Sequence, residues 1–183
     1  MNIFVLDSDP KLAAQMMCDK HVVKMIVESA QLLSTVHRFL DGDEYISISK
    51  NGRRIKRWSH PKGNFLYKSV MLNHPCTIWT RESVYNYSWL AAHAYSLCDE
   101  YDHRYEKVHS TRPLIEWLRT NPPKNIPWVT RTPYAQAMPD QYKVPGNAVA
   151  AYRAYYIGEK KRFAKWAYTK TPEWFLTNEV TTV

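Results

Sequence analysis

Glycine is scarce in this chain, with 5 among 183 residues. P-loop and Rossmann folds hold phosphate groups with glycine-rich turns, and neither glycine pattern occurs here. The HExxH pattern of zinc hydrolases is also missing. These absences argue against a nucleoside-triphosphate enzyme of the common kind, and we expect no cofactor.

Cysteine and long apolar runs are also scarce. The 3 cysteines are widely spaced, which suits a reducing compartment better than a disulfide framework. No run of about 18 apolar residues is present to span a membrane. The opening residues MNIFVLDSDP lack the basic start of a secretory signal. We therefore expect a cytoplasmic protein without a membrane partner.

Positive charge and aromatic side chains are abundant instead. The formal net charge is +8, and the chain has 7 Trp and 13 Tyr. Basic surfaces attract polyanions, and aromatic rings can stack on bases. Together they favour a nucleic acid or a nucleotide as partner. The alternative is a cationic enzyme whose aromatic residues are all internal.

One long helix is predicted over Cys18–Arg38. An apolar arc along it includes Val22, Val23 and Met25, and it is wide enough to make the helix central. A second, polar stripe presents His21, Lys24 and Glu28 on successive turns. An imidazole, an amine and a carboxylate lining a cleft can perform proton transfer or nucleophilic chemistry. The alternative is a solvated pair of Lys24 and Glu28 four residues apart.

The remaining patterns predict a mainly α protein, a single-domain helical bundle over residues 1–183 with a small inserted β-hairpin. The expected elements are helices at about 10–18, 77–103 and 111–120, a basic hairpin at about 44–58, a proline-rich connection over 121–146 and a C-terminal basic helix over 147–167.

The hairpin is predicted to turn at Asn51-Gly52, the favoured pair for a two-residue loop. Six basic residues and no acidic residue lie between Lys50 and Lys62, which suits contact with a phosphate backbone. The alternative is a solvated hairpin whose charges discourage edge pairing. The candidate nucleic-acid contacts are Arg53, Arg54, Lys56, Arg57, Arg81, Lys160, Lys161 and Arg162.

Two further patterns are weak. Cys18, His21, His74 and Cys76 are of the types that bind zinc, but the two pairs are remote in sequence and such spacings arise by chance, so no metal is predicted. Arg104 and His109 form an R-x4-H spacing that resembles the nuclease motif of HEPN-type domains. Tyr105 stands where those domains usually have a polar residue, and a solvated helix end is the simpler explanation.

The blocks NIFVLDSDP and CDKHVVKMIVESAQLLSTVHR, with the later YRAYYIGEKKRFAKW, resemble small tailed-phage proteins of unassigned activity. Leu12, Ala13 and Gln15 also form a Leu-Ala-x-Gln pattern similar to that of the phage pyrimidine-dimer DNA glycosylases. That resemblance implies a compact, helical, basic protein that acts on DNA rather than RNA. It also implies the N-terminal amine as nucleophile and a glutamate on the first long helix.

The chain departs from the glycosylase pattern at both catalytic positions. Met1 precedes Asn2, so we expect Met1 to be retained and no processed small residue to offer its amine. In register with the match, the glutamate position falls at Val23, and Glu28 lies more than one turn away. The leading hypothesis is a glycosylase-like or base-modifying enzyme in which Lys24 or the N-terminal amine attacks and Glu28 or Asp19 stabilises the developing cation. A non-catalytic nucleic-acid-binding or host-interaction protein is the alternative, and a metal-independent ribonuclease is the third.

Overall fold

A computed structural model describes residues 1–177. It confirms the prediction of a mainly α protein with a small antiparallel hairpin. The elements are α1 Pro10–Gln15, α2 Asp19–Asp41, β1 Glu44–Ile48, β2 Arg54–Trp58, α3 Pro75–Glu82, α4 Val84–Tyr105, α5 Arg112–Thr120, a 3-10 turn η1 Asp140–Tyr142, α6 Ala148–Lys160 and α7 Glu173–Thr177. None of the helices within residues 1–177 is both long and apolar enough to cross a bilayer.

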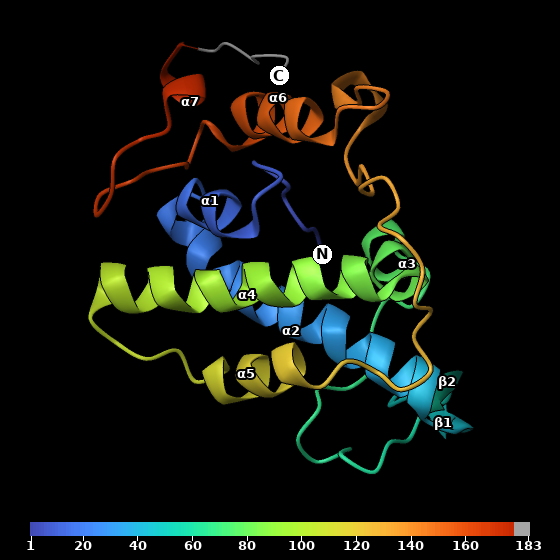
Figure 1. Cartoon of the computed structure of the whole chain (residues 1–183). Coiled ribbons are helices and arrows are strands. Elements are labelled where there is room, and N and C mark those ends of the chain that lie inside the picture. The colour runs from blue at the N-terminus through green and yellow to red at the C-terminus, as the bar shows by residue number, and fades with distance from the viewer. Residues whose placement is uncertain (178–183) are drawn as a thin grey trace.

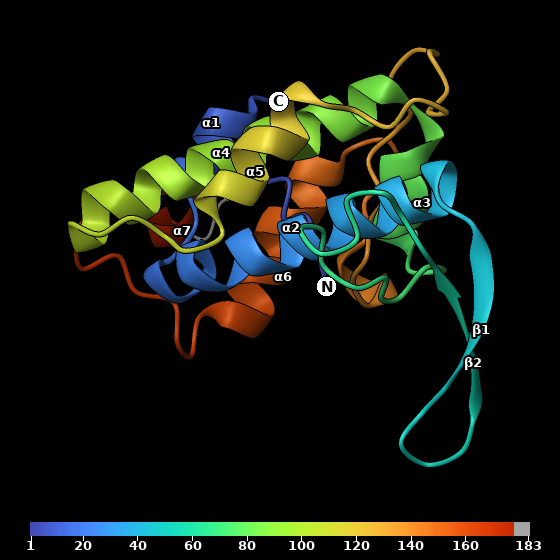
Figure 2. The ribbon, with the colours of Figure 1, turned by 90° about the horizontal axis from the view of Figure 1, so that it is seen from below.

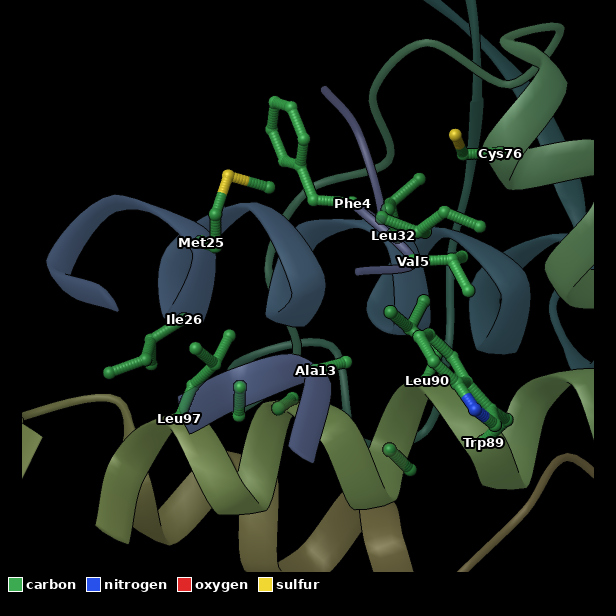
Figure 3. Close-up of a cluster of buried hydrophobic side chains, with 14 of the residues drawn as sticks. Phe4, Val5, Ala13, Met25, Ile26, Leu32, Cys76, Trp89, Leu90 and Leu97 are labelled. Carbon is green, nitrogen blue, oxygen red and sulfur yellow. The ribbon is translucent and has the colours of Figure 1, made fainter. Parts of the chain in front are cut away.

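Helices α2 and α4 form the centre of the molecule, with α1 and α5 packed against α4 (Figure 1). The N-terminal segment, residues 1–6, is not a strand but a segment without regular secondary structure that lies over α2. Figure 3 shows Phe4 and Val5 of this segment beside α2, and Ile26 of α2 facing α4. Each of these side chains is at most 5% exposed, so the segment is part of the core. This burial fixes the position of the first residue.

Helix α2 follows the predicted pattern closely. Val22 and Met25 are buried as the apolar arc predicts. Val23 is 38% exposed, so its assignment to the buried arc was wrong. Apolar side chains on a helix are buried only where a neighbouring element covers them, and at this position none does so fully.

The hairpin projects away from the helices at the end of α2 (Figure 2). Its register pairs Glu44 with Trp58 and Ile48 with Arg54. Ser49 and Arg53 continue the ladder, since the Ser49 amide donates to the Arg53 carbonyl at 2.8 Å. The loop is therefore residues 50–52, and the predicted two-residue turn at Asn51-Gly52 was wrong. Gly52 has a φ of 73°, the left-handed position that a three-residue loop places last.

The expected helix over 77–103 is two helices, α3 and α4, and the prediction of one helix was wrong. Ser83 is extended, with a φ of −153°, and its hydroxyl accepts from the Tyr85 amide at 3.1 Å to cap α4. The Val84 amide donates to the Pro127 carbonyl at 2.9 Å. A serine cap and a tertiary backbone bond therefore outweigh continuation of the helix.

Helix α6 ends at Lys160, seven residues before the predicted end at residue 167. The chain beyond it turns back to the start of α2, where the Lys165 carbonyl accepts from the Asp19 amide at 2.9 Å. The Ala167 amide donates to Oδ2 of Asp19 at 2.8 Å. These contacts require a non-helical chain, so Lys161 and Arg162 lie outside the helix.

Candidate functional site

The N-terminal segment turns sharply so that Met1 reaches α2. Phe4 has a φ of 37°, which is rare for a residue other than glycine. Asn2 stabilises the turn through Oδ1, which accepts from the amides of Ile3 at 2.8 Å and Phe4 at 3.3 Å. Its Nδ2 donates to the Ala137 carbonyl at 2.8 Å. A strained residue held by several partners is a common property of functional sites.

The α-ammonium of Met1 lies 3.9 Å from Oε2 of Glu28. The side chains of these residues are 6% and 15% exposed, so the pair is largely withdrawn from water. Nζ of Lys24 lies 3.2 Å from the other oxygen, Oε1, and this lysine is 66% exposed. Two amines thus flank one carboxylate that is largely shielded from water. Sequence comparison places Glu28 more than a turn from the expected glutamate position, yet the path of residues 1–6 brings the amine to it.

His74 is a further neighbour of this pair. Burial lowers its pKa, the positive charge of the N-terminus lowers it further, and Glu28 raises it. Nδ1 of His74 accepts from the Cys76 amide at 3.2 Å and so caps α3. In the neutral ring the proton is therefore on Nε2. Sequence analysis considered His74 as one of four residues of zinc-binding type and did not pair it with Glu28, because nothing local links the two.

His21 lies in an adjacent aromatic cluster. Its Nδ1 is 2.7 Å from the hydroxyl of Tyr156, and its ring is 4.7 Å from that of Phe4 and 5.5 Å from that of Phe163. Burial lowers the pKa of His21 to about 3, with smaller contributions from Lys160 and Lys24. The ring is neutral at pH 7. Of the predicted polar trio, Lys24 and Glu28 are in contact, whereas the ring contacts found for His21 are to aromatic residues.

Asp19 has a different role from Glu28, because the Asp19 carboxylate forms an ion pair with Arg104. Nη1 of Arg104 lies 3.0 Å from Oδ1 of Asp19, and Nη2 lies 2.9 Å from Oε2 of Glu100. The other donors of this guanidinium bind Glu100 and the carbonyls of Met17 and Gln15. All N–H groups of Arg104 are thus used, which leaves none for a scissile phosphate and argues against the ribonuclease hypothesis.

The four residues of zinc-binding type lie as two separate pairs in the structure. Cys18 and His21 both contact the Tyr156 hydroxyl, while His74 and Cys76 begin α3. Burial raises the pKa of the Cys76 thiol to about 12. Over residues 1–177, the cluster with metal-binding spacing is a different one, formed by His37, Asp41 and His60.

The candidate nucleic-acid contacts lie in three places. Arg53, Arg54 and Lys56 are exposed on the hairpin, and Lys56 pairs with Glu44 at 2.9 Å. Arg57 and Arg81 instead donate to carbonyls of Ser69 and Leu72, and Arg81 stacks on Phe39 at 4.5 Å. Lys160 stacks on Tyr155 at 4.4 Å, and Lys161 and Arg162 are exposed just beyond it.

The arrangement around Glu28 is suited to amine chemistry on an electrophilic carbon. A carboxylate next to an amine can take its proton and can stabilise a positive charge on the attacked group. The family model described as pyrimidine dimer DNA glycosylase matches residues 1–113, a range that contains Met1, Lys24, Glu28 and His74. The chain therefore belongs to the pyrimidine dimer DNA glycosylase family, which confirms the predicted resemblance. No curated protein and no solved structure matches it.

Proposed function

We propose that this protein is a DNA glycosylase that excises pyrimidine dimers, with the α-amine of Met1 as nucleophile and Glu28 as its carboxylate partner. The observation that carries the proposal is the 3.9 Å separation between the Met1 nitrogen and Oε2 of Glu28 in a largely buried setting. Family membership supports the substrate class. The distance is longer than a hydrogen bond, as is common before a substrate is bound.

The first step is transfer of a proton from the α-ammonium to Glu28, which frees the nitrogen lone pair. The amine then attacks C1′ of the deoxyribose, the electrons of the C1′–N bond leave with the base, and the base takes the proton from Glu28. The nitrogen then gives one proton to O4′ as the C1′–O4′ bond breaks, so the sugar ring opens and leaves an iminium joined to Met1. Glu28, a carboxylate again once the base has taken its proton, stabilises the positive charge of the iminium.

Basic groups near both ends of α2 support DNA as the partner. The hairpin follows the last turn of α2. At the other end, the positive charge of Lys160 lowers the pKa of His21, which lies in the first turn of α2. Helix α2 has 23 residues and is about 34 Å long, similar to one turn of B-DNA. We propose that Arg53, Arg54 and Lys56 hold the backbone at one end and Lys160, Lys161 and Arg162 at the other.

We also propose a cytoplasmic enzyme, on the ground that Cys18, Cys76 and Cys98 are all unpaired.

Borohydride trapping on an oligonucleotide with a cyclobutane pyrimidine dimer tests the nucleophile. We expect a covalent adduct that peptide mapping assigns to Met1. Lys24→Ala should keep the adduct, with Lys20→Ala on the same helix as control. An adduct on Lys24 would overturn the choice of amine but keep the glycosylase.

Substitution of Glu28 tests the carboxylate. Glu28→Gln should retain DNA binding and lose turnover by a factor of about 100 or more, while Glu106→Gln on the surface should change neither. If neither trapping nor base release occurs on dimer-containing or otherwise modified DNA, while hairpin variants abolish DNA binding, the protein is a non-catalytic nucleic-acid-binding protein.

A further inference from the structure

A second cluster of polar side chains lies at the opposite end of α2 from its first turn. His37 and Asp41 are four residues apart on α2, and His60 follows β2. One ligand atom from each lies within 4.8 Å of the other two. These residues line a cavity of about 480 Å³, which Trp117 and Asn121 also border.

The local hydrogen bonds define the protonation state of His37. The Tyr87 hydroxyl donates its only proton to the Leu118 carbonyl at 2.9 Å. Nε2 of His37, 2.9 Å from that hydroxyl, acts as the donor to it in the tautomer that binds a cation through Nδ1. The lone pair of the neutral ring is then on Nδ1. A histidine that gives its other N–H to a protein oxygen is the usual arrangement around metal ligands.

Asp41 is oriented in the same way. Its Oδ2 accepts from the Lys124 amide at 2.7 Å, and its Oδ1 accepts from the Asn125 amide at 3.0 Å. These two donors and Nδ2 of Asn125, which donates to Oδ1 at 3.1 Å, hold the carboxylate in place and leave Oδ2 a further lone pair. Outer contacts of this kind position the ligands of metal sites.

His60 is held by the chain on either side of it. The Arg38 guanidinium donates to the carbonyls of Trp58 at 3.0 Å and Gly63 at 2.7 Å. Nδ1 of His60 accepts a bond from the Lys62 amide at 3.0 Å, an exposed contact that the ring gives up when a cation takes its lone pair.

The pKa of both histidines is lowered in the fold. Burial lowers the pKa of His37 to about 4, His60 lowers it further, and Asp41 and the Asn121 carbonyl raise it. Burial also lowers the pKa of His60, Asp41 raises it and Arg38 lowers it.

We propose that His37, Asp41 and His60 form a binding site for a divalent transition-metal ion of the zinc type. Two imidazoles and one carboxylate are ligands that suit zinc or iron better than magnesium or calcium. In a tetrahedral zinc site the ligand atoms are about 3.3 Å apart, so this set has to close by no more than about 1.5 Å. Three protein ligands leave a coordination position open towards the cavity.

A bound ion joins the last turn of α2 to the segment after the hairpin, while Asp41 already joins α2 to the chain after α5. Its effect is therefore to fix the base of the hairpin relative to the bundle. This role is independent of Met1 and Glu28, so failure of the metal proposal leaves the glycosylase proposal intact.

The test is titration of the full-length, chelator-stripped protein with Zn²⁺, followed by calorimetry and, with Co²⁺, by visible absorption. We expect one equivalent per chain and a rise in melting temperature on adding Zn²⁺. Asp41→Asn and His60→Ala should each weaken binding by at least about tenfold, whereas His103→Ala on the surface of α4 should not. Absence of stoichiometric binding, or unchanged binding in both ligand variants, would overturn the proposal.

Discussion

The guanidinium of Arg104 and the carboxylate of Asp19 are 85 residues apart in the chain and form a 3.0 Å ion pair near the end of α4. The Arg104 side chain is fully buried. The same guanidinium binds the carbonyls of Gln15 and Met17, so it holds the junction between α1 and α2. The start of the helix that carries Glu28 therefore depends on one arginine of α4.

Replacing that arginine should destabilise the fold. We expect Arg104→Ala to lower the free energy of unfolding by about 3–5 kcal/mol, because Asp19 and Glu100 would be left without their buried partner. Urea denaturation followed by circular dichroism measures the change. Lys107→Ala, an exposed lysine just beyond α4, is the control and should be nearly neutral. A stable Arg104→Ala protein that had lost only a ribonuclease activity would restore the R-x4-H hypothesis.

Asn2 should matter for turnover more than for DNA binding. Asn2→Ala removes the acceptor of the Ile3 and Phe4 amides and the donor to Ala137, so the first residue is no longer held against α2. We expect the single-turnover rate of base release to fall by about tenfold to 100-fold, because displacement of a reacting group by about 1 Å has effects of this size. Equal losses of binding and rate in Asn2→Ala, or an equal loss in the control Asn64→Ala, would contradict this role.

Buried histidines make the stability fall in acid. Burial lowers the pKa of His93 from 6.5 to about 3, and neither ring nitrogen has a hydrogen-bond partner. Below pH 6.5 the unfolded chain takes up the proton and the folded protein does not, so stability present above that pH is lost as the pH falls towards 3.

At pH 5 this single group should cost about 2 kcal/mol relative to pH 8. The ring of His93 stacks on that of Trp89, with ring centroids 5.1 Å apart. His93→Phe keeps an aromatic ring in this place and removes the titratable imidazole. We expect a flatter dependence of unfolding free energy on pH for the variant, measured by denaturation between pH 5 and pH 8. His103→Ala is the exposed control, and an unchanged slope in His93→Phe would refute the assignment.

The hairpin should contribute electrostatic affinity for DNA. Replacing Arg53, Arg54 and Lys56 by alanine should reduce the dependence of log K on log salt by about 0.9 for each lost phosphate contact. Fluorescence anisotropy with duplex DNA at several salt concentrations measures it. The matched control is Lys107→Ala, at the far end of α4. A triple variant with the parent slope would show that the hairpin does not bind the backbone.

Local patterns predicted the elements better than their boundaries. The periodicity of Cys18–Arg38 gave α2 and its buried arc because that pattern is set by residues close in sequence. The break at Ser83 and the early end of α6 depend on bonds to Pro127 and Asp19, which a local pattern does not contain. Tertiary backbone contacts thus decided where these helices end.

The site was predictable in part for the same reason. The stripe on α2 identified Lys24 and Glu28, which are four residues apart and do form an ion pair. The proximity of the Met1 amine and His74 to Glu28 depends on the path of the N-terminal segment and on the placement of α3. Alignment by helix register pointed to Val23 and could not anticipate that path.

The contacts of Asn2 with Ala137, of His21 with Tyr156 and of Asp19 with Lys165 and Ala167 all reach beyond residue 113, where the family match ends. The matched portion contains the proposed reactive groups, and the later portion contacts the segments that carry them. Natural variation in the C-terminal third can therefore tune the efficiency of an enzyme of this kind without any change to the residues that perform the chemistry.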